Sequence, residues 1–264
     1  MSRWSLAVLA VLTLPAAARS QSPPPATPAQ CAERSVQRQA ERAASILGDW
    51  PALGRYRDGN ARLAPPAKGE ARIVFMGDSI TDNWDKEGYG GFFPGKPYVN
   101  RGISGQTTPQ MLVRFRPDVI ALHPKVVVIL AGTNDIAGNT GAMALSAVED
   151  NLASMAELSQ VHGIRVVLAS VLPVDDDDRD REGHLLLRTN CRPPSQIAAL
   201  NQWIRDYAAA HGHVYLDYAG PLSDEKGMLK ADLSDDGLHP NARGYAVMAP
   251  LAEKAIADAL KGKR

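Results

Sequence analysis

The sequence feature that most constrains the fold is an uninterrupted apolar run, Val-Val-Val-Ile-Leu, at residues 126–130. A strand buried on both faces has such a sequence, whereas a strand with one solvated face alternates apolar and polar residues. Sheets that are buried on both faces are usually parallel and carry helices on each side. The run therefore predicts a central strand of an α/β domain.

Segments of strand and helix character alternate along the rest of the chain. The other predicted strands are residues 71–76, 98–101, 165–171 and 214–217. The predicted helices are residues 32–47, 108–122, 142–162, 195–210 and 241–260, and residues 50–66, with several Gly and Pro, predict a loop. This alternation indicates a parallel sheet with helices on both faces, and in such folds ligands bind at the carboxyl edge of the strands.

The first 20 residues have the pattern of an export signal. Arg3 supplies a positive charge, residues 4–14 are apolar, and small residues at 16–18 suit cleavage after Ala18 or after Ser20. An N-terminal membrane anchor is the alternative, although the apolar stretch is short for a bilayer. Residues 21–30 are rich in Pro and Ala and predict an extended leader, which leaves residues 31–264 as one domain. We expect a secreted or periplasmic protein without a membrane span in its mature form.

Charge and cysteine content narrow the partners and the compartment. Lys and Arg together number 29, as do Asp and Glu, and this balance argues against a nucleic-acid partner. The chain has two cysteines, Cys31 and Cys191, which would pair as a disulfide in an oxidising compartment or otherwise remain as two thiols. Neither the charge balance nor the cysteine content indicates an oligomeric state.

Two polar motifs carry the residue types of a nucleophile and its base. Gly77-Asp78-Ser79 follows the first predicted strand, so Ser79 is expected on a strand-to-helix turn at the carboxyl edge, although a helix-capping role is the alternative. Asp236-Gly237-Leu238-His239 precedes the last helix. Its spacing allows the Asp236 carboxylate to orient His239, with Asp235 as a rival orienter and a structural loop histidine as the alternative.

Two further motifs supply candidate hydrogen-bond donors. The Asn134 amide in Gly-Thr-Asn-Asp follows the central strand and could donate to a developing oxyanion, or it could belong to a polar turn. Gly102 follows the second strand, where a glycine allows a backbone N–H to approach a ligand closely, or simply forms a flexible turn. All four motifs are expected at one edge of one sheet.

With these four motifs in this chain order, the sequence resembles the SGNH hydrolases, also called GDSL esterases/lipases. The resemblance spans residues 71–260 and implies a flavodoxin-like, three-layer α/β/α sandwich with a five-stranded parallel sheet. It implies that Ser79 is the nucleophile, that His239 is the general base and that Asp236 orients it. It also implies an oxyanion hole made by the N–H groups of Ser79 and Gly102 and the Asn134 amide, with no metal or other cofactor.

The substrate is less constrained than the reaction. The segments around Ser79 and Gly102 resemble the branch of the family that contains platelet-activating-factor acetylhydrolase and sugar acetylesterases, so the resemblance implies short acyl groups, chiefly acetyl, on a small-molecule or polysaccharide ester. A lipase, thioesterase or arylesterase is the alternative within the family, and a non-catalytic carbohydrate-binding protein or a flavodoxin-like electron carrier lies outside it.

Three features between the motifs leave alternatives open. Trp84, Tyr89, Phe92 and Phe93 could stack on sugar rings or pack in the core. Residues 173–194 are expected to form a long loop over the site that shapes specificity. Its acidic run, residues 175–182, predicts a solvated loop, with a cation site as the alternative.

Overall fold

The computed structural model describes residues 43, 47–176 and 187–262. The chain divides into two compact units, residues 1–45 and 46–264, and the second contains the sheet and its helices. The predicted signal peptide and leader lie outside the described residues, as does nearly all of the predicted helix at 32–47.

Five parallel strands form one sheet with the order β2-β1-β3-β4-β5, which is the strand order of flavodoxin-like folds. The strands are β1 (Ile73–Gly77), β2 (Tyr98–Gly102), β3 (Val126–Leu130), β4 (Arg165–Ala169) and β5 (Val214–Leu216). Every residue of β3 is buried, as its continuous apolar sequence predicts. The predicted α/β/α sandwich with a five-stranded parallel sheet is confirmed.

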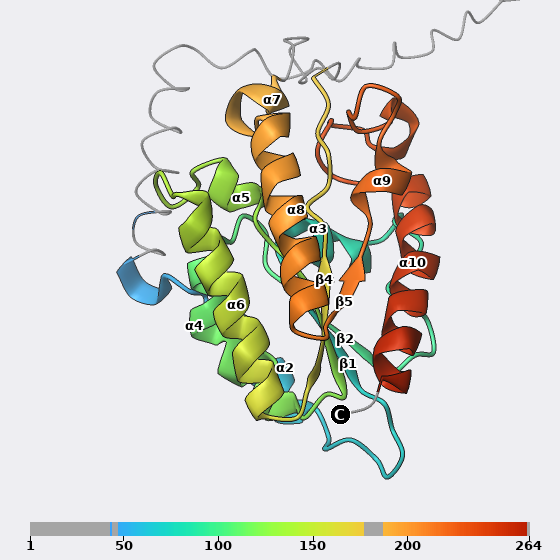
Figure 1. The fold of residues 1–264 in the computed structure, drawn as a ribbon. Coiled ribbons are helices and arrows are strands. Elements are labelled where there is room, and N and C mark those ends of the chain that lie inside the picture. The colour runs from blue at the N-terminus through green and yellow to red at the C-terminus, as the bar shows by residue number, and fades with distance from the viewer. Residues whose placement is uncertain (1–42, 44–46, 177–186, 263–264) are drawn as a thin grey trace, which may run out of the picture. The chain divides into compact units, whose positions relative to one another are not determined.

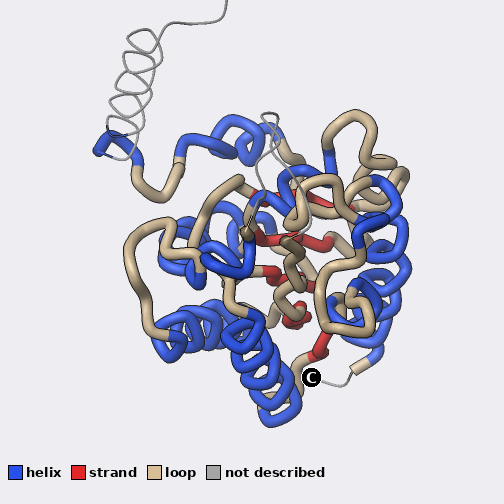
Figure 2. Tube along the Cα trace, turned by 90° about the horizontal axis from the view of Figure 1, so that it is seen from above, coloured by secondary structure: helices blue, strands red, loops and turns tan. Residues whose placement is uncertain are grey.

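Helices cover both faces of the sheet (Figures 1 and 2). One face carries α4 (Thr108–Asp118), α6 (Leu145–Val161) and α8 (Pro194–Ala210), and the other carries α10 (Ala242–Lys261). The shorter helices are α2 (Gly54–Arg62), α3 (Ser79–Asp82), α5 (Thr133–Ile136), α7 (Arg188–Cys191) and α9 (Ala219–Leu222), with 3₁₀ turns at Asn83–Asp85, Ile120–Leu122 and Ala231–Leu233. Among the described residues no helix has the length and apolar character needed to cross a membrane.

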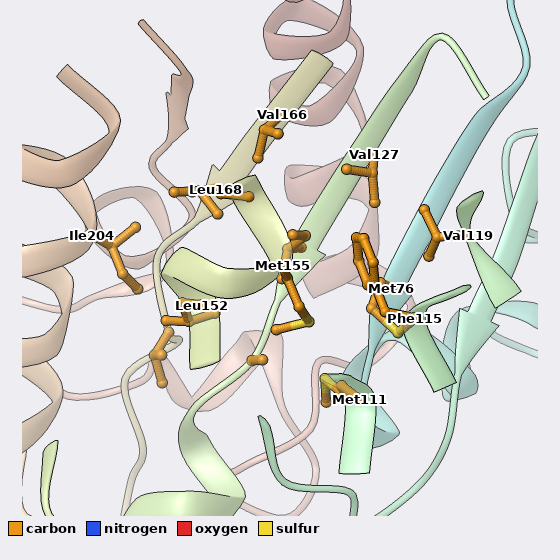
Figure 3. Packing of buried hydrophobic residues seen from close by; sticks show 14 of the residues in the cluster. Met76, Met111, Phe115, Val119, Val127, Leu152, Met155, Val166, Leu168 and Ile204 are labelled. Atoms are coloured by element: carbon orange, nitrogen blue, oxygen red, sulfur yellow. The ribbon is translucent and has the colours of Figure 1, made fainter. Parts of the chain in front are cut away.

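Alternate strand residues enter two separate hydrophobic cores. Val127 and Leu168 point toward the helices α4, α6 and α8, where they meet Phe115, Met155 and Ile204 (Figure 3). Burial of such side chains stabilises the fold by about 1.5–3 kcal/mol each. The sheet is thus held rigidly from both sides, which fixes the positions of its carboxyl edge.

The other core contains the aromatic residues that follow β1. Trp84 and Phe93 are buried and pack with Phe75 and Tyr245, with ring centroids 4.8–6.2 Å apart. Tyr89 and Phe92 are partly buried and pack against the same core. Of the two alternatives for these aromatic residues, core packing is the one observed.

The predicted loop at residues 50–66 is wrong in part, because Gly54–Arg62 form helix α2. Two glycines lower the intrinsic helix propensity of this segment, so tertiary contacts must supply its stability. Asn60 donates to Asp118 at 2.7 Å, and Arg101 donates to Asn60 at 2.7 and 2.9 Å. The Tyr56 hydroxyl donates to the Gly102 carbonyl. These partners are distant in sequence and leave no local signal.

Helix α4 ends earlier than predicted, at Asp118 rather than residue 122. The chain continues as a 3₁₀ turn and then reverses at His123, which has φ of 53°. Val119, the residue after the helix, has φ of −125° and ψ of −66°, outside the helical region, so the α-helical hydrogen bonding stops there.

Candidate active site

The nucleophile candidate lies where β1 turns into α3. Ser79 is the first residue of α3, and Asp78 caps this helix by accepting from the Ile80 N–H at 2.9 Å. A Cβ on Gly77 would lie 2.1 Å from Thr81 Oγ1 and 3.0 Å from the Leu130 carbonyl oxygen, so only glycine allows this tight turn. The turn places the Ser79 hydroxyl at the carboxyl edge of the sheet.

The segment before α10 brings a histidine and a carboxylate to this serine. His239 Nε2 lies 2.9 Å from Ser79 Oγ, and His239 Nδ1 lies 2.7 Å from Asp236 Oδ2. Both distances are within hydrogen-bond range. Ser79 and His239 are 160 residues apart in sequence, yet the structure brings together the three residues that the motifs predicted.

Asp236 is fixed by hydrogen bonds from its own turn. Its Oδ1 accepts from the N–H groups of Leu238 at 3.0 Å and His239 at 2.7 Å. Burial alone would raise the pKa of the Asp236 carboxyl, but the hydrogen bonds from His239 and Leu238 hold that pKa well below its ordinary value. Asp236 is therefore ionised at neutral pH, and it can accept the Nδ1–H of His239. The rival orienter, Asp235, is exposed and accepts from the Asn241 amide instead.

Asn134 lies in α5, directly after β3, and its side chain is 3% exposed. Its Nδ2 donates to the Gln106 carbonyl at 3.0 Å. This contact joins the amide to the loop that follows β2, so two of the predicted donor motifs adjoin each other.

Gly102 does not offer the free N–H that the sequence predicted. Its N–H donates to Asn100 Oδ1 at 2.8 Å, and the residue is buried at the end of β2. A Cβ there would lie 2.2 Å from the Asp82 nitrogen, so Gly102 is needed for close packing against α3. The prediction that Gly102 donates to a ligand is therefore wrong for this structure.

Gly105, in the turn after β2, has the features that Gly102 lacks. It is exposed, has φ of +81°, and its N–H has no acceptor among the described residues. Its carbonyl accepts from Asn139 Nδ2 at 3.0 Å, and the next residue, Gln106, accepts from Asn134. The sequence offered a signal, since Gly105 is the second glycine of the motif Arg-Gly-Ile-Ser-Gly at residues 101–105, whose first glycine is Gly102.

Polar contacts on both the buried and the exposed side hold this turn in place. Arg114, which is fully buried, donates to the Gln106 side chain at 2.5 Å, to Asp118 at 3.0 Å and to the Gly77 carbonyl at 3.1 Å. Asp82 accepts from the Ser104 hydroxyl at 2.6 Å. The turn is thereby fixed relative to both β1 and α3, as a site with preorganised donors requires.

Asp78 is a fully buried carboxylate beside the nucleophile. Desolvation raises its pKa to about 6, against lowering contributions from the Ile80 N–H and nearby positive charge. Its Oδ2 has no hydrogen-bond partner among the described residues. Such a group destabilises the folded state when it is ionised.

Two arginines near the site belong to no motif that the sequence analysis identified. Arg188, in α7, donates to the Asp236 carbonyl at 2.9 Å. Arg192, which follows α7, donates from Nε to Thr133 Oγ1 at 3.0 Å and from Nη2 to Asn134 Oδ1 at 3.4 Å. Both lie in the long loop that was predicted to shape the site, and residues 177–186 of that loop lie outside the described residues.

The disulfide and the cation alternative remain predictions. Cys191 is exposed, whereas Cys31 lies outside the described residues. Within residues 47–176 and 187–262 no group of three or more His, Cys, Asp or Glu side chains is arranged to hold a metal ion. Asp176, at the start of the acidic run, accepts from the Thr189 N–H at 2.8 Å.

Comparison with known proteins identifies the class to which this fold and site belong. The model of the GDSL-like lipase/acylhydrolase family matches residues 75–247. The match covers more than half of the polypeptide and includes Ser79, His239 and Asp236. The chain belongs to this family of hydrolases, as the resemblance implied.

Individual relatives refine the comparison. The chain is similar to the crystal structure of a GDSL-like lipase from Bacteroides thetaiotaomicron, with 42% identity, a TM-score of 0.71, and coverage of 79% of this chain and 98% of that one. It is 36% identical to an acetylxylan esterase of Geobacillus stearothermophilus over 25% of this chain and 40% of that protein. It is 32% identical to an uncharacterised lipoprotein of Bacillus subtilis over 40% of this chain and 51% of that protein. The chain thus spans about half or less of the length of these two curated relatives.

Proposed function

We propose that this protein is a serine ester hydrolase that removes short acyl groups, chiefly acetyl, from a carbohydrate ester. The observation that carries the proposal is the hydrogen-bonded chain in which Ser79 Oγ lies 2.9 Å from His239 Nε2, and His239 Nδ1 lies 2.7 Å from Asp236 Oδ2. This is the arrangement that activates a serine hydroxyl in hydrolases of unrelated fold.

In the proposed reaction, His239 takes the proton of Ser79 while Ser79 Oγ attacks the ester carbonyl carbon. The tetrahedral intermediate collapses as His239 gives that proton to the leaving alcohol, and an acyl-enzyme remains. Water then adds to the acyl-enzyme in the same way, which releases the acid and restores the Ser79 hydroxyl. Ionised Asp236 accepts from His239 Nδ1–H and stabilises the positive imidazolium in both steps.

We assign the stabilisation of the oxyanion to three donors in the segments that follow β1, β2 and β3 at the carboxyl edge of the sheet. The N–H of Ser79 lies in the first turn of α3 and is outside the helical hydrogen bonding. The other two donors are the Asn134 amide and the N–H of Gly105, which replaces Gly102 in this role. Each such donor typically accelerates the reaction by about 10²–10³-fold.

The substrate class rests on the resemblance and on one relative. The acetylxylan esterase that the chain resembles carries its activity in its name, and the sequences around Ser79 resemble the acetylhydrolase branch. The aromatic residues after β1 pack in the core, so sugar binding falls to other surfaces around the site. A lipase or thioesterase of the same family is the alternative.

The proposed location is outside the cytoplasm. The N-terminal pattern of charge, apolar run and small residues supports export, and one relative is a lipoprotein. An N-terminal sequence of the exported protein, determined by Edman degradation, would locate cleavage after residue 18 or after residue 20. An intact N-terminus in the exported protein would contradict the signal peptide.

Hydrolysis of p-nitrophenyl acetate by the purified protein tests the proposed activity. The parent protein is expected to turn over this ester, and Ser79→Ala is expected to reduce kcat by about 10⁴-fold or more. Ser146→Ala, at an exposed serine on α6, is the matched control and should retain most of the activity. Activity of Ser79→Ala within tenfold of the parent would contradict the assignment of the nucleophile.

A further inference from the structure

Asn134 poses a problem of orientation, because the two ends of a side-chain amide have nearly the same shape but opposite polarity. With Nδ2 toward the site, the amide stabilises an oxyanion. After a 180° rotation, Oδ1 would face the oxyanion and repel it. Something in the structure must therefore distinguish the two ends.

The contacts of Asn134 distinguish the nitrogen end of its amide from the oxygen end, because each end has a partner of its own. The Gln106 carbonyl can only accept a hydrogen bond, and it lies 3.0 Å from Nδ2. A guanidinium can only donate, and Arg192 Nη2 lies 3.4 Å from Oδ1. Rotation of the amide would place two acceptors together on one side and two donors together on the other.

Arg192 is itself held in position and is almost fully withdrawn from solvent, at 8% exposure. Its Nε donates to Thr133 Oγ1 at 3.0 Å, one residue before Asn134, so the guanidinium spans two successive side chains of α5. The buried, partly unsatisfied carboxylate of Asp78 supplies compensating negative charge nearby. Burying a guanidinium costs free energy unless hydrogen bonds and an opposite charge compensate it. Arg192 is therefore held by these contacts rather than by water.

We infer that Arg192 is a positioning residue for the proposed reaction, locking the Asn134 amide with its nitrogen toward the oxyanion site. This inference rests on the proposed function. It explains why Arg192 contacts two successive residues of α5, and why a residue with no motif of its own would affect the rate rather than substrate binding. Because Arg192 acts only through Asn134, the effects of the two residues cannot be independent.

A double-mutant cycle with p-nitrophenyl acetate tests the inference. Arg192→Met is expected to lower kcat by at least tenfold, but by no more than Asn134→Ala alone, with KM within about threefold of the parent. In the Asn134→Ala background, Arg192→Met should change kcat by less than threefold. Arg205→Met, at an exposed arginine on α8, is the control and should leave kcat and KM unchanged.

A second variant guards against a loss of folding. Arg192→Lys keeps a positive charge near Asp78 but not the planar pair of donors, so it should fold and still lower kcat by about tenfold. Circular dichroism and the thermal midpoint establish that each variant is folded.

Four results would overturn the inference. They are equal effects of Arg192→Met in both backgrounds, a rise in KM alone, full activity of Arg192→Met, and full activity of Arg192→Lys. An active parent with any of these results overturns the role of Arg192 alone, whereas an inactive parent overturns the proposed function as well.

Discussion

The buried carboxylate of Asp78 leads to a quantitative expectation for stability as a function of pH. Its pKa is raised to about 6 in the folded protein, mainly by desolvation, from an ordinary value of 3.8. The folded state therefore binds the proton more tightly than the unfolded state does. Asp78 is expected to favour folding most at pH values below 3.8, and this contribution is lost as the pH rises through 6.

The magnitude follows from the size of the shift. A shift of about two pKa units corresponds to about 3 kcal/mol between a pH well below 3.8 and a pH well above 6. Asp236 acts in the opposite direction, because its pKa is lowered, but its contribution changes only below its ordinary pKa. The window between pH 4.5 and 7.5 therefore isolates Asp78 from Asp236.

Urea unfolding of the parent and of Asp78→Asn across that window measures this contribution. The stability of the parent relative to the variant is expected to fall by about 2 kcal/mol as the pH rises from 4.5 to 7.5. Asp58→Asn, at an exposed carboxylate, should give a curve parallel to that of the parent. Parallel curves for the parent and Asp78→Asn would refute the argument that Asp78 is ionised in a desolvated site.

Three further expectations concern the site and its surroundings. Asn134→Ala should lower kcat by about 10²–10³-fold with little change in KM, measured with p-nitrophenyl acetate, because the lost donor acts on charge that develops in the transition state; a change confined to KM would reassign Asn134 to substrate binding. The kcat/KM should fall from acetate to butyrate to octanoate esters, since a deep apolar channel would instead return about 0.8 kcal/mol per methylene, and a steady rise to octanoate would favour the lipase alternative. Cys31 and Cys191 should form a disulfide worth about 4–5 kcal/mol by loop entropy, and intact-mass analysis after alkylation without reductant would contradict this if both thiols were modified.

The sequence was sufficient to predict the centre of the sheet because burial on both faces leaves a mark in the inner strands β1, β3 and β4. The continuous apolar run at Val126–Leu130 is such a local signal, and all five of its residues are buried in β3. Helix α2 is the opposite case. Its glycine-containing sequence has weak local preference, and its stability comes from contacts with Arg101 and Asp118, which are distant in the chain.

The residues of the candidate site also divide into those that local motifs predicted and those whose place depends on contacts distant in the chain. Ser79, Asp236 and His239 lie in motifs whose spacing and position after strands predicted their meeting, and their distances agree with that prediction. The choice between Gly102 and Gly105 depended on which N–H the fold leaves unpaired, and that is decided by the side chain of Asn100. Arg192 had no motif at all, because its role arises only from how its loop returns to α5.

Covalent trapping of the nucleophile tests whether His239 activates Ser79. The parent protein is treated with a fluorophosphonate, which reacts with activated serines, and the modified residue is located by peptide mass mapping. One phosphonyl adduct is expected, on Ser79, and it should be lost in His239→Ala, where no base activates the hydroxyl. An adduct on another serine, or equal labelling of Ser79 in His239→Ala, would contradict it.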